Sequence, residues 1–127
     1  MRKYSCYIPV ILILMSFCSL ILFRGSLTRY ASRIMTNGME PEEKSIVENI
    51  ISEQYDYSKN TKGYECTFLE FGSVGCNSCR QMESVMAEIK QKYSNRVKVV
   101  FINVSQKENR ELVDYFGIVT IPTQVLL

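Results

Sequence analysis

Residues 66–104 read CTFLEFGSVGCNSCRQMESVMAEIKQKYSNRVKVVFINV, and this stretch decides the fold class. Its first part, residues 66–71, is a mostly apolar run that predicts a buried strand. Apolar side chains then recur at helical spacing from Met82 to Tyr93, and residues 97–104 form a second apolar run. A strand, a crossover helix and another strand of this length imply parallel pairing with right-handed winding. The stretch therefore predicts an α/β domain.

One further helix is predicted before this unit in the sequence and another after it. Residues 41–55 carry apolar side chains at helical spacing after a proline at the first helical position, which predicts an amphipathic packing helix. Ser105 and Glu108 have the spacing of a capping box, and the helix that it would start ends at Gly117. The polar residues 56–65 are expected to form a connection.

Composition limits the possible functions. The chain has 127 residues, which is enough for one domain and an attachment segment, and 46% apolar with 22% charged residues is typical of a folded protein. The formal net charge is +2, and both excess charges, Arg2 and Lys3, precede the first apolar run, so a nucleic-acid partner is not expected. Histidine is absent, which excludes mechanisms that depend on an imidazole.

The amino-terminal segment, residues 1–23, does not fit a soluble fold. After the basic start, residues 7–23 carry no charge and predict a membrane-inserting helix. No small-residue cleavage site follows Phe23, which favours an uncleaved anchor over a signal peptide whose removal would release a secreted protein. Lipid attachment at Cys18 is disfavoured by the bulky Phe17, so Cys6 and Cys18 are expected to act as small apolar residues.

The domain that follows this segment is expected to be extracytoplasmic. The short basic amino terminus is typical of an export signal, although the arginines after the apolar run oppose this orientation under the positive-inside rule. Residues 24–39 are mixed polar and are interpreted as a linker, and residues 40–127 as the domain, with its core at 64–127. The membrane is therefore a predicted partner through residues 7–23.

The chemistry is concentrated in Cys76-Asn77-Ser78-Cys79, which follows the first strand and begins its helix. Unpaired peptide N–H groups and the helix dipole stabilise a thiolate at such a position. Cys79, one turn later, can reach the sulfur of Cys76, so Cys76 is predicted to attack a disulfide and Cys79 to resolve the mixed disulfide. A zinc site that also used Cys66 would lack a fourth ligand, whereas a purely structural disulfide is the stronger alternative.

The last segment adds a second motif. Residues 119–127 predict an extended segment interrupted by Pro122, which is expected at an edge or a turn. Residues 66–127 resemble a thioredoxin in the strand TFLEF, the Cys-containing segment at 75–79, the strand VKVVFINV and the triplet Ile121-Pro122-Thr123. The resemblance implies a thioredoxin-like fold, a central mixed sheet flanked by helices, preceded here by a hydrophobic helix. It also implies that the fold is incomplete at the C-terminus, because the family continues with another strand and a closing helix.

The resemblance assigns roles to further residues. It implies that Pro122 is cis and packs against the active-site disulfide, and that the backbone of Ile121 pairs with the substrate. Thioredoxins carry a buried acid at the position of Glu70, which could exchange a proton with Cys79 if its strand face is buried, and which would be an ordinary exposed glutamate otherwise. Asn77 and Ser78 replace the family's Gly-Pro pair between the cysteines and are expected to tune the redox potential.

The predicted function is thiol-disulfide exchange on extracytoplasmic proteins, more as a reductase than as an oxidant. This chemistry needs no cofactor and no metal; its substrates are protein thiols and disulfides, and the resemblance suggests an integral membrane thiol carrier as electron donor. The alternative is a redox-silent thioredoxin-like module that binds other proteins. A peroxidase on the same fold is disfavoured because those enzymes use a different cysteine motif.

Overall fold

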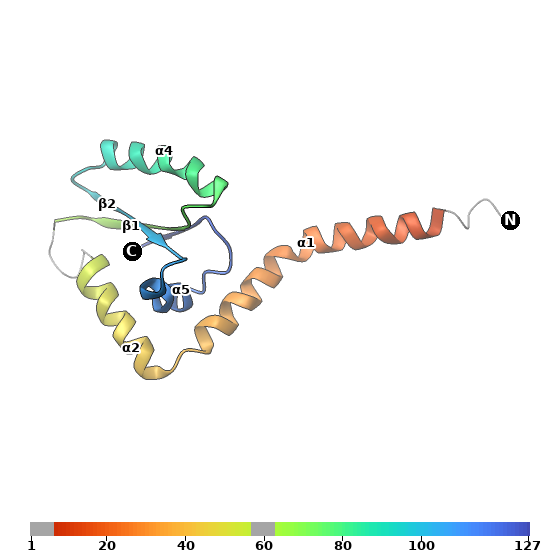
Figure 1. Ribbon diagram of the computed structural model, residues 1–127, viewed down its shortest axis with the longest axis horizontal. Helices are drawn as coiled ribbons and strands as arrows, with labels where there is room; N and C mark the ends of the chain where they lie inside the picture. Colours follow the sequence, from red (N-terminus) through yellow and green to blue (C-terminus); the bar gives the residue numbers. More distant parts are fainter. Residues whose placement is uncertain (1–6, 57–62) are drawn as a thin grey trace.

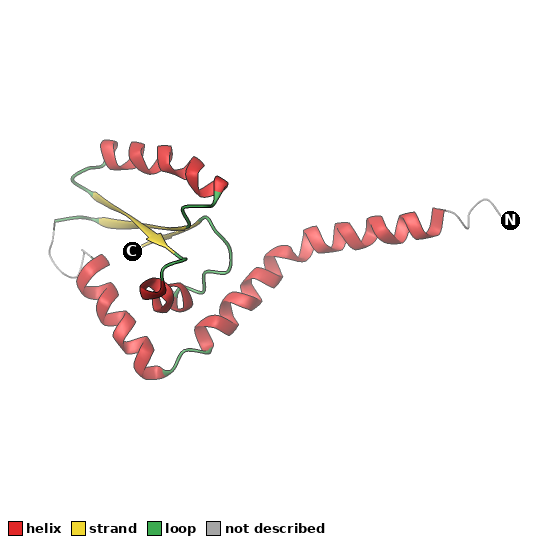
Figure 2. Ribbon diagram, viewed as in Figure 1, coloured by secondary structure: helices red, strands yellow, loops and turns green. Residues whose placement is uncertain are grey.

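The apolar run that begins at Cys66 forms the central strand of the sheet. The computed structural model describes residues 7–56 and 63–127, so Arg2, Lys3, Cys6 and most of the predicted connection at 56–65 lie outside the described residues. Helices cover both faces of the sheet, and one long helix extends away from it (Figures 1 and 2). The elements are α1 (Tyr7–Asn37), α2 (Pro41–Ile50), the π-helical turn η1 (Ile51–Tyr55), β1 (Cys66–Gly72), α4 (Asn77–Lys92), β2 (Val97–Asn103), the 3-10 turn η2 (Lys107–Asn109), α5 (Arg110–Tyr115) and β3 (Thr123–Leu126).

The described sheet has the strand order β2-β1-β3. β1 and β2 pair in parallel, with Cys66 opposite Val97, which confirms the predicted β-α-β unit. β3 runs antiparallel to β1, with Phe71 opposite Thr123, so the sheet is mixed. Because side chains alternate along a strand, residues 67, 69 and 71 of β1 point to one face and residues 68, 70 and 72 to the other.

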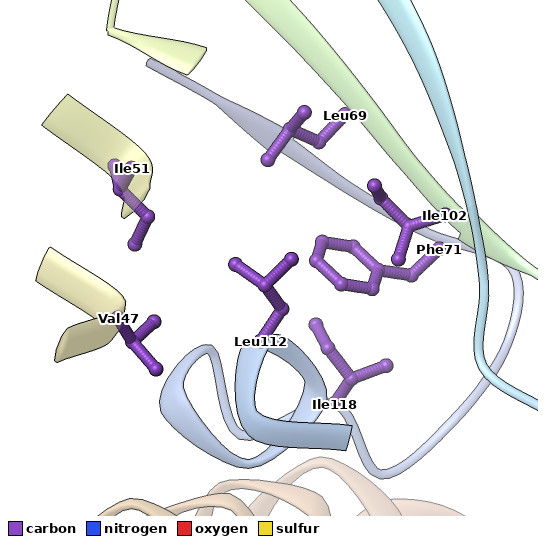
Figure 3. Packing of buried hydrophobic residues seen from close by; sticks show 7 residues of the cluster. All are labelled: Val47, Ile51, Leu69, Phe71, Ile102, Leu112 and Ile118. Carbon is purple, nitrogen blue, oxygen red and sulfur yellow. The ribbon is translucent and has the colours of Figure 1, made fainter. Parts of the chain in front are cut away.

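The hydrophobic core lies between the first of these faces and the helices α2 and α5 (Figure 3). Leu69 and Phe71 are fully buried, and Val47 of α2 reaches the same cluster. The helix predicted at 41–55 is thus confirmed as a packing helix, with η1 as its last turn. The cluster consists of Val47, Ile51, Leu69, Phe71, Ile102, Leu112 and Ile118.

The helix α1 continues well past the apolar run. Residues 24–37, for which the sequence suggested only a linker, are helical up to Asn37. The polar end of α1 contacts α5, and the hydroxyl of Thr36 donates a hydrogen bond to the carbonyl oxygen of Tyr115 at 3.5 Å. Within the described residues, α1 is the one helix long and apolar enough to cross a membrane. A signal sequence would pass the same test of length and composition.

The predicted capping box does not form. Gln106 precedes η2 and makes no side-chain capping bond. Instead, the hydroxyls of Ser105 and Ser73 form a hydrogen bond of 3.1 Å. This bond joins the loops that follow β1 and β2, because the carboxyl ends of parallel strands meet at the same edge of a sheet. A tertiary contact has therefore displaced the local one that the spacing predicted.

Gly117 lies close against the backbone of α1. Gly117 has φ +59°, and a Cβ there would lie 2.8 Å from the carbonyl oxygen of Ser32 and would also meet its hydroxyl. We expect Gly117→Ala to lower the free energy of unfolding by about 2 kcal/mol or more, because left-handed strain of about 1–2 kcal/mol adds to a collision. Chemical unfolding of the full chain in detergent micelles measures the loss.

Gly63→Ala is the matched control for this substitution. Gly63 also has a positive φ, +84°, but a Cβ there meets nothing within 4 Å, so only the strain remains. We expect a loss of about 1 kcal/mol. Equal losses in the two variants would show that the contact between α1 and Gly117 contributes nothing to stability.

Candidate functional site

The two cysteines of the C-x-x-C motif lie where β1 ends and α4 begins. Cys76 and Cys79 form a disulfide, with their Cα atoms 5.2 Å apart. Cys76 is the N-cap residue of α4, and its Sγ accepts a hydrogen bond from the backbone N–H of Cys79 at 3.1 Å. The first turn of α4 holds no acidic residue, so no side chain there opposes the positive end of the helix dipole. A thiolate at Cys76 would therefore be stabilised by the helix.

Cys76 and Cys79 differ in solvent exposure, as is expected if one cysteine attacks a substrate and the other only resolves the mixed disulfide. Cys76 is half-buried, whereas Cys79 is only 3% exposed. A cavity of about 250 Å³ opens beside Cys79 and is lined by Glu83 and Met86 of α4 and by Phe101 of β2. An incoming disulfide thus has access to Cys76, while Cys79 lies beneath it against the sheet.

Gly72 allows this close approach of α4 to the sheet. A Cβ at Gly72 would lie 3.3 Å from both the Cβ and the Sγ of Cys79, and 2.8 Å from Cε2 of Phe101. Gly72→Ala is expected to cost about 1–3 kcal/mol of stability, the usual cost of overpacking, and to move Cys79 away from β1. Chemical unfolding of the oxidised full chain measures this cost. Gly75→Ala is the control, because a Cβ at Gly75 meets nothing within 4 Å; a similar loss there would contradict the explanation.

Glu70 lies on the same face of β1 as Gly72, and its side chain is 0% exposed. The alternative of an exposed strand glutamate is therefore excluded. One carboxylate oxygen, Oε2, accepts a hydrogen bond from Nε2 of Gln124 at 2.7 Å, and the other, Oε1, is buried without a partner among the described residues. Burial raises the pKa of the Glu70 carboxyl above its ordinary value, and the bond from Gln124 opposes this rise. A carboxyl in this setting can hold a proton nearer to neutral pH.

The loop before β3 reaches the same end of the sheet. The peptide bond between Ile121 and Pro122 is cis, as the resemblance implied. Because Phe71 pairs with Thr123, the antiparallel register places Pro122 level with Gly72, the residue that also meets Cys79. Both loop residues are half-buried, and within the described chain the backbone of Ile121 takes no part in a hydrogen bond. An extended substrate could use those backbone groups.

Asn77 and Ser78 lie beside the disulfide, whereas Cys66, the third cysteine of the domain, lies far from it. Asn77 and Ser78 are exposed and form the first turn of α4, next to the disulfide. Cys66 is a free thiol at the opposite end of β1, where it lines a separate cavity with Phe68 and Tyr93. The structure therefore brings Cys76, Cys79 and the cis-proline loop to one end of the sheet and leaves Cys66 at the other. Glu70 lies two residues from the first end, on the same face of β1 as Gly72, beside which Cys79 packs.

Gln124 was not predicted from the sequence. The one signal for it was its place among the three polar residues of the otherwise apolar segment from Ile118 to Leu127, and Thr120 and Thr123 share that signal. A polar residue at that position has the same local pattern whether it faces solvent or a buried carboxyl, so its role became visible only through the pairing with Glu70.

Comparisons with known proteins agree with this geometry. The family model for thioredoxin matches residues 47–127. The thioredoxin of Alicyclobacillus acidocaldarius is 31% identical over 71 residues, covering 56% of this chain and 66% of that protein. Thioredoxin 1 of Synechococcus elongatus is 38% identical over 58 residues, covering 46% of this chain and 52% of the relative.

A solved structure shows the same fold. Oxidised thioredoxin O2 from Arabidopsis thaliana superposes with a TM-score of 0.50 at 17% identity, covering 66% of this chain and 67% of that one. The chain spans about half to two thirds of the length of the curated relatives named above. Since the family model covers most of the chain, including the disulfide and the cis-proline loop, the protein belongs to the thioredoxin family.

Proposed function

We propose that this protein is a thiol-disulfide oxidoreductase, and that it acts as a reductase of extracytoplasmic proteins. The observation that carries the proposal is the asymmetry of the disulfide. Cys76 is accessible and caps α4, whereas Cys79 is buried one turn later against Gly72. This arrangement suits an attacking thiolate and a resolving thiol.

The proposed cycle transfers two electrons to the substrate. In the reduced protein, the Cys76 thiolate attacks one sulfur of a substrate disulfide; the substrate S–S bond breaks and the first substrate thiolate leaves. Cys79 passes its proton to Glu70 and attacks Sγ of Cys76, which breaks the mixed disulfide and releases the second substrate thiolate. The two leaving thiolates take up protons, and the protein is left with the disulfide seen here.

The remaining site residues would position the substrate and set the redox potential. The free backbone groups of Ile121 would pair with an extended substrate segment next to Pro122, in the way that a strand adds to a sheet edge. Asn77 and Ser78, in the first turn of α4, lie close enough to the sulfurs to alter the stability of the Cys76 thiolate. Renewal of the dithiol requires a donor of the thiol class, for which we propose a thiol carrier embedded in the membrane.

The membrane assignment rests on α1. Its apolar part, residues 7–23, would span the bilayer, residues 24–39 would connect it to the domain, and residues 40–127 would form the thioredoxin-like domain outside the cytoplasm. Because residues 24–37 are helical and α1 contacts α5, this connection would hold the domain at a set distance from the bilayer.

The reduction potential of the Cys76/Cys79 pair tests the proposal. The full chain in detergent micelles is equilibrated with glutathione or dithiothreitol buffers, and the free thiols are counted by alkylation. A potential near about −270 mV supports a reductase, whereas a potential near about −120 mV would make the protein an oxidant. A pair that cannot be cycled at all would leave a redox-silent binding module as the function.

A further inference from the structure

The two oxygens of the Glu70 carboxyl have different surroundings. Oε2 accepts the hydrogen bond from Nε2 of Gln124 at 2.7 Å, while Oε1 is buried and has no partner among the described residues. A buried carboxylate oxygen without a partner is costly, and such an atom in a native fold calls for an explanation. Proton uptake at Oε1 would remove the charge that burial penalises, so Oε1 is the oxygen at which this carboxyl can change its protonation state.

The sheet itself holds Gln124 in place. Glu70 and Gln124 are opposite each other in the antiparallel pairing of β1 with β3, so their side chains leave the sheet on the same face. The neighbour of Glu70 on the other side is Phe101 of β2, which offers no hydrogen bond. Gln124 is therefore the one hydrogen-bond donor to the Glu70 carboxyl in the described chain. Gln124 is itself exposed, so it lies between the buried carboxyl and the solvent.

Among the residues that the structure describes, no charged side chain donates to Glu70 in place of this amide. β3 contributes the apolar Leu126 beside Gln124, and from α4 only the exposed Glu83 brings a charge to the cavity next to Cys79. In the described residues, the titratable side chains that line the two cavities on this face are Cys66, Glu65, Tyr93 and Arg96 at one end and Cys79 and Glu83 at the other. Of these, Glu65 and Arg96 neutralise each other in an exposed ion pair.

We propose that Gln124 is a positioning residue that holds Oε2 of Glu70 and leaves Oε1 as the atom that takes the proton from Cys79. The inference deepens the proposed function and rests on it. A side-chain amide suits this task because its nitrogen can donate to Oε2 in both states: when Oε1 carries the proton, Oε2 is the carbonyl oxygen of the acid and still accepts the hydrogen bond. Glu70 can thus change its charge without leaving Gln124 unpaired. The transfer converts the Cys79 thiol into the attacking thiolate and Glu70 into a neutral acid.

Direct titration of Glu70 is the first test. The full chain, oxidised and in detergent micelles, carries ¹³C-labelled glutamate, and Glu70→Gln identifies the Glu70 carboxyl signal. Gln124→Met has a similar length but no donor, so the midpoint of the Glu70 titration is expected to rise by about one pH unit, a tenfold change in proton affinity. Gln124→Lys should move the midpoint down, because an ammonium group favours the carboxylate. Leu126→Met, on the same strand and face, should leave it unchanged.

Opposite shifts from two substitutions at one exposed position cannot come from a general loss of structure. An unchanged midpoint in both Gln124 variants would overturn the proposal. So would an equal shift in Leu126→Met, because that result would show that any disturbance of β3 alters Glu70.

The second test follows the proton transfer. The reduced chain is treated with dithiobis(nitrobenzoate): attack by Cys76 releases one coloured thionitrobenzoate anion and leaves the other half, colourless, as a mixed disulfide on Cys76. Attack by Cys79 then releases the second coloured anion, and this second release is the step that is followed. The pH profile of this single step should move up by about one unit in Gln124→Met and down in Gln124→Lys, with the same limiting rate at high pH. If the Glu70 midpoint moves and the release profile does not, the positioning role is overturned while thiol exchange stands. Failure of the unaltered chain to release the dye would instead overturn the proposed function.

Discussion

Cys76→Ser is expected to abolish disulfide exchange, whereas Cys79→Ser is expected to keep the first step and stop at the mixed disulfide. The reason is geometric: Cys76 is accessible and receives the N–H of Cys79 at the start of α4, while Cys79 is almost fully buried. Only the outer sulfur can meet a substrate, and only the inner one can release it. With a small disulfide-bonded protein as substrate, we expect a covalent adduct of Cys79→Ser in non-reducing electrophoresis and none of Cys76→Ser.

Cys66→Ser is the matched control for these two variants. Cys66 is a free, half-buried thiol at the far end of β1, lining a different cavity. Its substitution should leave both the exchange rate and the adduct pattern unchanged. A Cys76→Ser protein that still exchanged disulfides would overturn the assignment of the nucleophile, and one that kept its biological function without exchange would favour a binding module.

Glu70→Gln is expected to raise the free energy of unfolding and to slow the resolution of the mixed disulfide by Cys79. At neutral pH the folded state must keep a fully buried carboxyl whose oxygen Oε1 has no partner among the described residues, and a neutral amide removes the charge. We expect a gain of about 1–3 kcal/mol in the free energy of unfolding, the order of the penalty for a buried, incompletely paired polar group. Resolution by Cys79 should slow by about 100-fold, the lower end of the contribution of a positioned proton acceptor.

The stability gain of Glu70→Gln has a defined pH dependence. The pKa of Glu70 is raised in the folded state by burial, so the folded protein binds the proton more tightly than the unfolded chain does. The contribution of Glu70 to stability is therefore highest below the ordinary value of 4.5 and is lost as the pH rises through its folded-state pKa. Glu70→Gln should lack this decline, so its advantage appears only on the high-pH side, as unfolding at a series of pH values will measure.

Glu65→Gln is the control, because it is expected to change stability in the opposite direction from Glu70→Gln. The hydrogen bond from Arg96 lowers the pKa of the Glu65 carboxyl, and both side chains are exposed. Its removal should lower stability slightly above the pKa of Glu65 and have no effect on exchange. If Glu70→Gln also lowered stability at neutral pH, the buried carboxylate would have to be held by favourable interactions, and its role as a proton acceptor would be contradicted.

The sequence predicted those helices and strands whose apolar residues follow a regular local pattern. Continuous apolar runs identified β1 and β2, because a strand covered on both faces is apolar throughout. A period of 3.6 identified α4 and the packing helix that starts at Pro41, because burial of one face imposes that period on a helix. The position of Cys76 and Cys79 at the start of α4 followed from the same pattern. The family resemblance added the cis bond before Pro122, which no periodicity reveals.

The sequence by itself determined the types of the elements from Pro41 onward and the position of the two cysteines at the start of a helix, because the residues next to one another in the chain encode both. It missed the helical residues 24–37 of α1. Tertiary structure decided which groups surround those cysteines. The missing side chain of Gly72 leaves room for Cys79 against the sheet, and that of Gly117 leaves room for Ser32 of α1. Gln124 donates a hydrogen bond to Glu70, which lies 54 positions earlier in the sequence. The burial of Glu70 itself depended on the packing of α4 over its face of β1, where Cys79 lies against Gly72. Contacts of this kind depend on strand register and helix packing, and a local pattern is the same whether or not the distant partner is there.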